Sequence, residues 1–343
     1  KNEYENALNK YVEASKYDPK FIQALMNSGH IYVIKNYLNK ALAVYAKVLE
    51  LTPDNPTALC NIALIKYKQG DKNAAFNILF KLAVKGGEKN YLVHKYLGII
   101  WLEKGKAHDA IVSLKKAVEL NNKDIDNHIN LGVCFHKTNV LNTGAEHYLK
   151  ALDIEPQNMI ALKNLALLYF DWGKNHEAIE LYEKLLDLEP ENMPAIKNIG
   201  HSYRKIGGLS KAIEHYNSYI RINDKDPEIH LNLGITYFET DDFTNAHEAF
   251  KTLLKLGKKY LPISYCYLSK IYEKSEEYNY ALDFARKAVH IDGKYAEGFV
   301  QYGKMSLKSG KKNKAISYLE KALALEPRHK EAKTLLDELL PAK

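Results

Sequence analysis

Residues 178–192 read AIELYEKLLDLEPEN, and close variants of this string return along the chain. Residues 41–55 read ALAVYAKVLELTPDN, residues 145–158 read AEHYLKALDIEPQN and residues 315–329 read AISYLEKALALEPRH. Apolar residues in each string recur three or four positions apart, which is the spacing of an amphipathic helix. The proline near the end of each string cannot continue a helix interior, so it predicts where that helix ends. The strings therefore predict one type of helix that is repeated along the chain.

Aligning the strings gives a period of about 34 residues. Residues 1–21 are expected to be the second helix of a partial leading repeat. Residues 330–343 carry apolar residues on one side and charges on the other, as a C-terminal capping helix needs to shield the last repeat from water. Between them we expect nine tandem repeats, at residues 22–55, 56–89, 91–124, 125–158, 159–192, 193–226, 227–260, 262–295 and 296–329.

Small residues recur at two fixed places in the copies, and an aromatic residue usually follows the first of them by three positions. Apolar residues at helical spacing run through each half of a copy, so each copy is predicted to be two helices. Small residues allow these two helices to approach closely, and the rings fill the space around them. The small residues are Gly29, Ala63, Gly98, Gly132, Ala166, Gly200, Gly234, Ser269 and Gly303 at the eighth position, and Ala41, Ala75, Ala110, Gly144, Ala178, Ala212, Ala246, Ala281 and Ala315 at the twentieth.

This pattern resembles the tetratricopeptide repeat (TPR) family over essentially the whole chain. The resemblance implies an all-α fold, a right-handed superhelical solenoid of antiparallel helix pairs. It also implies that the first helix of each pair lines a concave groove in which such proteins bind ligands. A single helix pair cannot bury its own apolar stripe, so the pairs are expected to stack into one continuous core.

No catalytic constellation is present in the sequence. It contains no GxxxxGK[ST] phosphate loop, no HExxH metal motif and no GxSxG nucleophile motif. The three cysteines lie far apart and match neither a disulfide framework nor a zinc site. His94, His128 and His230 take a position at which the family often has tryptophan, so a packed ring is the preferred interpretation over a metal ligand. We expect no enzyme, no cofactor and no metal.

The charge balance bears on the class of partner. Lys and Arg number 49 against 42 Asp and Glu, which gives a net charge of +7 spread over the chain. The densest basic run is Lys304, Lys308, Lys311, Lys312 and Lys314. Acidic residues alternate with basic ones elsewhere and no nucleic-acid motif is present, so a nucleic-acid partner is not favoured. No apolar run approaches the ~20 residues that span a bilayer. Protein partners are therefore expected, and a homo-oligomer stays open.

The sixth position of the copies forms a ladder of asparagines on the expected groove. An amide offers both a donor and an acceptor, so the ladder could hold the backbone of an extended peptide. The alternative interpretation, that these amides bond within the repeat, stays equally open. The ladder consists of Asn27, Asn61, Asn130, Asn164, Asn198 and Asn232.

The ninth and twelfth positions are apolar in the middle copies, which indicates a groove for an amphipathic helix or an apolar-anchored peptide. Some of these residues are expected to pack in the core instead of facing the groove. The most basic part of the lining combines lysines with His201 and Arg204, and it could accept an acidic side chain or a terminal carboxylate. It does not reproduce the carboxylate clamp of TPR co-chaperones. The predicted partner-binding residues are Asn130, Lys163, Asn164, Leu167, Phe170, Lys197, Asn198, His201, Arg204, Asn232, Ile235 and Phe238.

These features predict a non-catalytic scaffold or adaptor that binds peptide or helix segments of partner proteins in its groove. Richness in Lys, Asn, Ile and Tyr suggests an AT-rich bacterial genome, and hence a larger assembly of the envelope, pilus or flagellar type. Two alternatives are a regulatory TPR region of a larger enzyme whose catalytic domain lies outside this chain, and a self-assembling structural element. The sequence does not decide whether the protein is located in the cytoplasm or in the bacterial periplasm. Attachment to a membrane through an upstream segment is one alternative.

Overall fold

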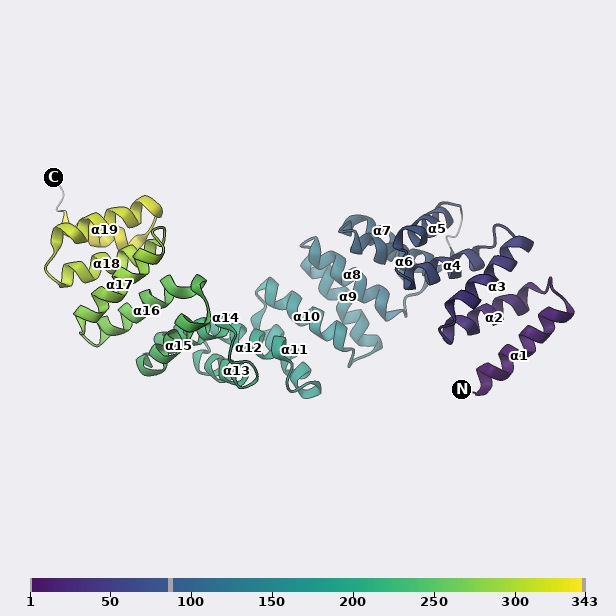
Figure 1. Ribbon diagram of the computed structural model, residues 1–343, viewed down its shortest axis with the longest axis horizontal. Helices are drawn as coiled ribbons and strands as arrows, with labels where there is room; N and C mark the ends of the chain where they lie inside the picture. Colours follow the sequence, from purple (N-terminus) through teal and green to yellow (C-terminus); the bar gives the residue numbers. More distant parts are fainter. Residues whose placement is uncertain (1, 86–88, 341–343) are drawn as a thin grey trace. The chain divides into compact units, whose positions relative to one another are not determined.

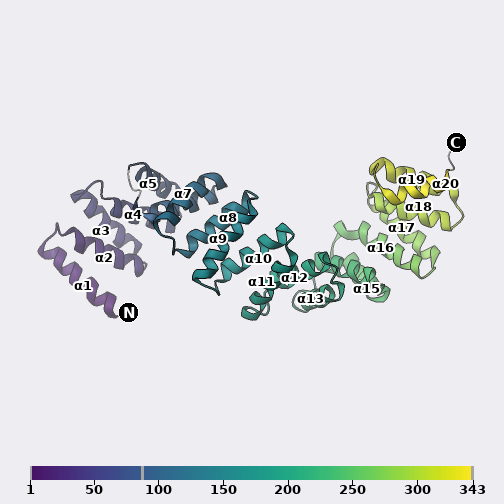
Figure 2. The same ribbon diagram turned by 180° about the vertical axis from the view of Figure 1, so that it is seen from behind.

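The computed structural model describes residues 2–85 and 89–340, and the secondary structure assigned in them is helical (Figure 1, Figure 2). The chain divides into two compact units, Lys1–Leu168 and Tyr169–Lys343. The helices of the first unit are α1 Asn2–Tyr17, α2 Ile22–Ile34, α3 Leu38–Leu51, α4 Pro56–Lys68, α5 Lys72–Val84, α6 Tyr91–Glu103, α7 Ala107–Leu120, α8 Ile125–Lys137 and α9 Leu141–Ile154. The boundary between the units falls within α10, Met159–Trp172.

The second unit continues the same alternation of helices. One additional 3₁₀ turn, η2, precedes α16 and takes up extra residues there. Its elements are α11 Asn175–Leu188, α12 Met193–Lys205, α13 Leu209–Ile222, α14 Pro227–Glu239, α15 Phe243–Leu256, η2 Lys258–Tyr260, α16 Leu261–Lys274, α17 Tyr278–Ile291, α18 Ala296–Lys308, α19 Lys312–Leu325 and α20 Lys330–Leu339.

Each pair consists of a first and a second helix that pack against each other, such as α6 with α7 and α16 with α17. The second helix also packs on the first helix of the next pair, as α7 does on α8. First helices of neighbouring pairs touch directly as well, as α6 touches α8 and α16 touches α18. The expected all-α fold of stacked helix pairs is confirmed. We call the side of the first helices that is turned away from the second helices the inner face of each unit.

The repeat boundaries themselves stay a prediction. Parts of three predicted segments, at residue 1, residues 86–88 and residues 341–343, lie outside the described residues.

The close approach within a pair depends on the small residue of the first helix. A Cβ atom added to Gly132 would lie 2.5 Å from the ring of Tyr148, and one added to Gly200 would lie 2.6 Å from the ring of Tyr216. Both rings are fully buried. Glycine therefore leaves the space that the ring of the second helix fills, which is the packing that the small-and-aromatic pattern predicts.

A left-handed backbone residue closes the turn inside each pair. Its φ lies between +57° at Asp241 and +86° at Gly70. Glycine and asparagine adopt this conformation most readily, and they supply most of these positions. Asp241, with φ +57°, and Glu276, with φ +61°, are the exceptions in side-chain type. The residues are Asn36, Gly70, Gly105, Asn139, Gly173, Gly207, Asp241, Glu276 and Gly310, and they follow one another at intervals of 34 or 35 residues.

Candidate functional site

The predicted partner-binding residues all lie on first helices. Asn130 is on α8. Lys163, Asn164, Leu167 and Phe170 are on α10. The remaining residues follow on two further first helices, namely Lys197, Asn198, His201 and Arg204 on α12, and Asn232, Ile235 and Phe238 on α14. The first four, through Leu167, belong to the first unit and the others to the second, so each group is described by itself.

In the first unit, Leu167 is the most accessible of the predicted residues. Its side chain is 41% exposed, whereas the neighbouring Leu165 and Leu168 are buried. Asn130, Lys163 and Asn164 are half-buried. Stacking of the helices thus leaves Leu167 in contact with solvent, together with Ile160 near the start of α10, which is 59% exposed.

In the second unit, the predicted basic stretch is paired with carboxylates of the next first helix. Lys197 Nζ contacts the carboxylate of Glu228 and lies 3.8 Å from Asp226. Arg204 donates to Glu239 Oε1 at 2.8 Å. Burial alone would lower the pKa of Lys197, but the hydrogen bond and charge of Glu228 and the charge of Asp226 raise it. An acidic ligand would therefore have to displace the chain's own carboxylates, which the sequence-based expectation did not include.

His201 adds little positive charge to this stretch at neutral pH. Burial lowers the pKa of its imidazole, and this effect outweighs the nearby Glu228 carboxylate. Its Nδ1 atom lies 3.3 Å from the hydroxyl of Tyr216, and its ring contacts Phe170 edge to face. The residue therefore acts as part of the packing between helices in this unit.

The asparagine ladder forms hydrogen bonds inside the chain. Asn198 Nδ2 donates to the hydroxyl of Tyr182 at 2.8 Å. Asn232 Nδ2 donates to the backbone carbonyl of Glu228 at 2.8 Å, and Asn61 Nδ2 donates to that of Thr57 at 2.9 Å. For these three side chains the structure favours the interpretation of bonding within the chain. Each amide has two N–H groups, so one donor of each can still reach a ligand.

The apolar lining of the second unit divides between core and surface. Ile235 and Phe238 pack against a buried cluster that includes Phe250, and Phe238 meets Tyr267 edge to face at 5.4 Å. Both stay half-exposed, as does Phe170. The ammonium group of Lys205 lies 4.0 Å from the centre of the Phe170 ring. Packing therefore uses one side of these residues and leaves the other side accessible.

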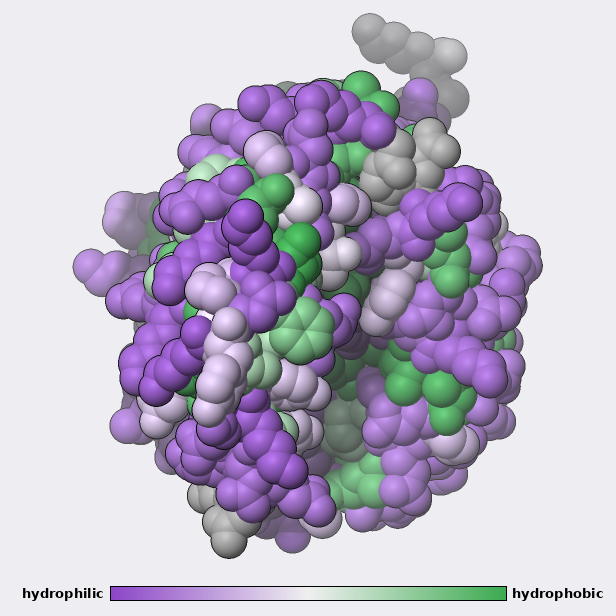
Figure 3. Space-filling view, turned by 90° about the vertical axis from the view of Figure 1, so that its right-hand side faces the viewer, coloured by the Kyte–Doolittle hydropathy of each residue, from purple (hydrophilic) through white to green (hydrophobic). Residues whose placement is uncertain are grey.

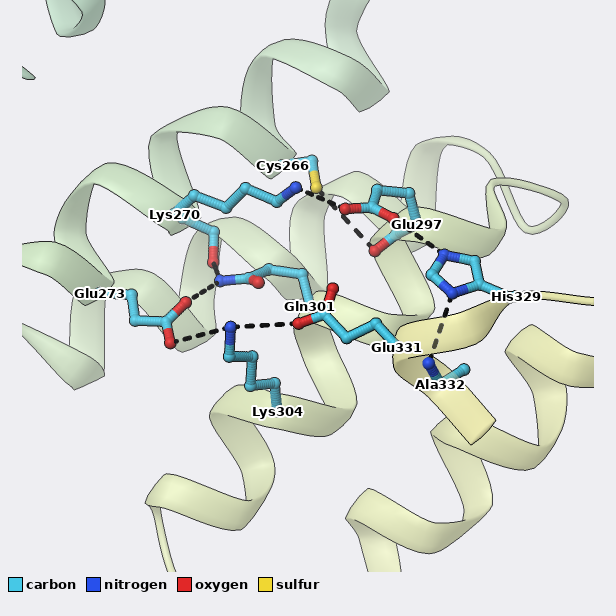
Figure 4. Close-up of polar contacts among 10 residues, drawn as sticks. Cys266, Lys270, Glu273, Glu297, Gln301, Lys304, His329, Glu331 and Ala332 are labelled. Carbon is cyan, nitrogen blue, oxygen red and sulfur yellow. Dashed lines mark hydrogen bonds and ion pairs between the residues drawn. The ribbon is translucent and has the colours of Figure 1, made fainter. Parts of the chain in front are cut away.

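A polar network on α16, α18 and α20 was not predicted from the sequence (Figure 4). Lys270 contacts the carboxylate of Glu297, which also accepts a hydrogen bond from His329 Nε2 at 2.9 Å. The Nδ1 atom of His329 then accepts from the backbone N–H of Ala332 at 3.4 Å, which caps α20. Burial would raise the pKa of Glu297, but Lys270 and His329 hold it below its usual value. The network links three successive first helices.

The second half of this network lies beside a cavity. Gln301 donates to Ser269 Oγ at 3.2 Å and to Glu273 Oε2 at 2.9 Å. Lys304 lies 3.3 Å from both Glu273 and Glu331. The sequence signal that could have revealed the network is the recurrence of lysine in one first helix with an acid at the start of the next. The adjoining cavity, of about 420 Å³, is lined by Phe238, Lys270, Glu273, Lys274, Glu276, Tyr278, Lys304, Lys308 and Glu331.

Other classes of site receive no support within residues 2–85 and 89–340. No group of three or more His, Cys, Asp or Glu side chains there could hold a metal ion. None of the helices in that part of the chain has the length and apolar character to cross a bilayer. On the face drawn in Figure 3, hydrophilic residues predominate and hydrophobic ones form small separate groups.

Comparison with known proteins agrees with this architecture. A family model described as TPR repeat matches residues 29–70 and 200–241, and one described as tetratricopeptide repeat matches residues 161–192 and 296–329. The four matched segments are tetratricopeptide repeats. The crystal structure of a TPR protein from Parabacteroides merdae ATCC 43184 covers 73% of the chain and 98% of its own length, with 22% identity and a TM-score of 0.51, so the two share a fold.

Two further similarities are weaker. YrrB, described as a TPR protein with an unusual peptide-binding site, covers 54% of this chain and 95% of its own, with 23% identity and a TM-score of 0.47. The anaphase-promoting complex subunit CDC16 of Saccharomyces cerevisiae is 27% identical over 165 residues, which is 46% of this chain. The chain spans 20% of that curated relative.

Proposed function

We propose that this TPR protein is a non-catalytic scaffold whose inner faces bind segments of partner proteins. The observation that supports this function is the exposure of apolar side chains on the first helices. Leu167 on α10 is 41% exposed, and Phe170 and Phe238 are half-exposed. Exposed apolar groups on a stacked helical surface are the usual anchors for a helix or an extended peptide.

The binding mode follows from the physical character of these faces. Apolar anchors supply affinity through burial, and the remaining N–H groups of Asn198 and Asn232 can orient a peptide backbone. The charged groups of the second unit stiffen the surface, because Lys197 and Arg204 bridge α12 to α14. A stiff surface loses little conformational entropy when it binds.

The proposal includes the absence of catalysis by this chain. Its prominent titratable groups on the inner face of the second unit pair with one another, as Lys270 does with Glu297 and Lys304 does with Glu273. Structural ion-pair networks also pair and perturb titratable groups in this way, so we assign these groups a structural role. We extend the proposal to a role within a larger assembly, of the bacterial envelope, pilus or flagellar type, on the strength of the amino-acid composition.

A peptide-display selection tests the inner face of the first unit. Peptides selected on the immobilised full chain are synthesised with a fluorescent label, and their Kd is measured by anisotropy. Leu167→Asp should weaken binding at least about tenfold, because it places a charge where an apolar anchor is buried. Leu149→Asp is the matched control, since Leu149 is 44% exposed but lies on the second helix α9.

Circular dichroism should show equal helicity in both variants and in the parent protein, because both positions are exposed. The proposal for this face fails if the selected peptides bind the Leu167→Asp protein as tightly as the parent. It also fails if Leu149→Asp weakens binding to the same extent.

A further inference from the structure

The turn between α18 and α19 and its flanking helix ends carry four lysines that form no direct ion pair within the described part of the chain. We call Lys308, Lys311, Lys312 and Lys314 the basic turn, and all four are exposed. Within the described part of the chain, none of their ammonium groups has a carboxylate oxygen within 4.0 Å. Lys304, one helical turn earlier, contrasts with them because it lies between Glu273 and Glu331. The basic turn is therefore available to an external anion.

A cavity with aromatic walls adjoins the basic turn. Its volume is about 640 Å³, and Tyr278, Tyr280 and Leu282 of α17 line one side. Lys308 and Lys311 line the other side. Tyr280 is 59% exposed, and the ammonium group of Lys308 lies 5.9 Å from the centre of the Tyr278 ring. A cavity of this size accepts one aromatic or branched apolar side chain between rings and lysine stems.

We propose that this edge of the protein binds a short acidic segment of a partner protein, with one apolar side chain in the cavity and carboxylates on the basic turn. Charge complementarity provides the attraction, and the tyrosines provide the anchor site. The surface lies at the turn between two helices of a pair, outside the residues of the inner face that carry the proposed scaffold function.

A peptide fits this edge better than a nucleic acid does. Glu276 and Glu277 line the same cavity, and a continuous phosphate backbone would meet them at close range. The turn between α14 and α15 carries Glu239, Asp241 and Asp242, so the positive charge does not continue along the neighbouring turns. A peptide can place its carboxylates only opposite the lysines and present an uncharged residue elsewhere.

Fluorescence anisotropy with a defined probe tests the proposal. The probe is a labelled peptide of about twelve residues in which glutamates flank a single phenylalanine. The double variant Lys308→Glu/Lys311→Glu should raise its Kd at least about tenfold, and added salt should weaken binding to the parent protein. The matched control is Lys184→Glu/Lys255→Glu, which makes the same charge change at exposed lysines on α11 and α15 and should leave Kd within about twofold.

Two further variants separate binding from folding and from charge alone. Lys312→Glu should weaken peptide binding yet raise the thermal midpoint, because an acidic residue in the first turn of α19 interacts favourably with the helix dipole. Tyr280→Ala should weaken binding of the phenylalanine peptide but have little effect on the same peptide with serine in that place. Loss of binding together with increased stability cannot come from unfolding.

Three results would overturn the proposal. The first is peptide affinity that is unchanged in Lys308→Glu/Lys311→Glu. The second is tighter binding of an oligothymidylate of about twelve nucleotides than of the peptide at equal ionic strength, which would assign the edge to nucleic acid. The third is sedimentation evidence that the lysine variants abolish self-association while the peptide does not bind, which would assign the edge to a second copy of the chain.

Discussion

At the scale of single residues, the identity of one side chain sets how closely two helices pack. Gly132 on α8 faces the ring of Tyr148 on α9, with 2.5 Å between that ring and an added Cβ. Gly234 on α14 has the same relation to Phe250, but the corresponding distance is 3.0 Å. The two glycines therefore occupy equivalent positions, but the neighbouring ring leaves more room for a methyl group at Gly234 than at Gly132.

Gly132→Ala should destabilise the protein by about 1–3 kcal/mol, because the buried ring must move to make room. In an exposed helix interior the same change would stabilise by about 1 kcal/mol, so the sign of the effect is diagnostic. Urea denaturation followed by circular dichroism measures it. Gly234→Ala should reduce the free energy of unfolding by less than Gly132→Ala does. A stabilising effect of Gly132→Ala would contradict the packing described.

A pair of imidazoles, one buried (His128) and one half-buried (His147), makes the first unit sensitive to acid. His128 Nε2 donates to the backbone carbonyl of Asn122 at 3.0 Å, so its Nδ1 accepts from His147 Nδ1 at 3.1 Å. Burial, together with the charges of His128, Lys150 and Lys115, lowers the pKa of His147 to about 4. The neutral form of His147 is therefore favoured in the folded state.

Stability of the first unit should fall as the pH drops from about 6.5 toward about 4, because the unfolded chain binds a proton that folded His147 resists. With allowance for solvent screening, the effect is on the order of 1–2 kcal/mol. Urea denaturation at pH 7.5 and pH 5 measures it. His147→Gln should reduce the difference, whereas His108→Gln, at an exposed position, should not; equal differences in all three proteins would refute the assignment.

At the scale of helices, ion pairs join several first helices to the next one, as between α6 and α8, α12 and α14, and α16 and α18. Lys95 on α6 lies 2.9 Å from Asp124 and 2.7 Å from Asp126, at the start of α8. Lys270 on α16 has the same relation to Glu297 on α18. Each ammonium group is largely buried, so it depends on its partner for compensation.

Glu297→Gln should destabilise the second unit by about 2–3 kcal/mol, because it removes the charge that compensates buried Lys270 and weakens the acceptor of His329. Glu320→Gln, on the exposed side of α19, is the control and should be nearly neutral. A double-mutant cycle with Lys270→Met measures the coupling energy between Lys270 and Glu297. A coupling energy near zero would show that the pair contributes only packing.

At the scale of the whole molecule, a substitution in one helix pair should have little effect on the stability of distant pairs, because each pair contacts only its neighbours. The two compact units, divided within α10, are consistent with this local organisation. The binding surfaces proposed for the two units can therefore be altered one at a time.

Hydrogen exchange of the Glu297→Gln protein tests this independence. Protection should fall in α16, α18 and α20, whose first-helix contacts include the altered network, and should be unchanged in α2 to α8. Parallel loss of protection in both units would instead show one cooperative folding unit. The parent protein under identical conditions is the reference.

Local spacing alone determined the helix pairs, their small-and-aromatic contacts and the family resemblance, because these features depend on residues within one period of the sequence. The predicted binding residues were correctly placed on first helices for the same reason. Only the tertiary structure showed that Lys197 and Arg204 are paired with Glu228 and Glu239, and that Asn198 bonds to Tyr182. Stacking brings residues more than a dozen positions apart into contact. A single sequence does not show which of these distant side chains will pair. The cavity beside the basic turn arises in the same way, from the packing of two neighbouring pairs.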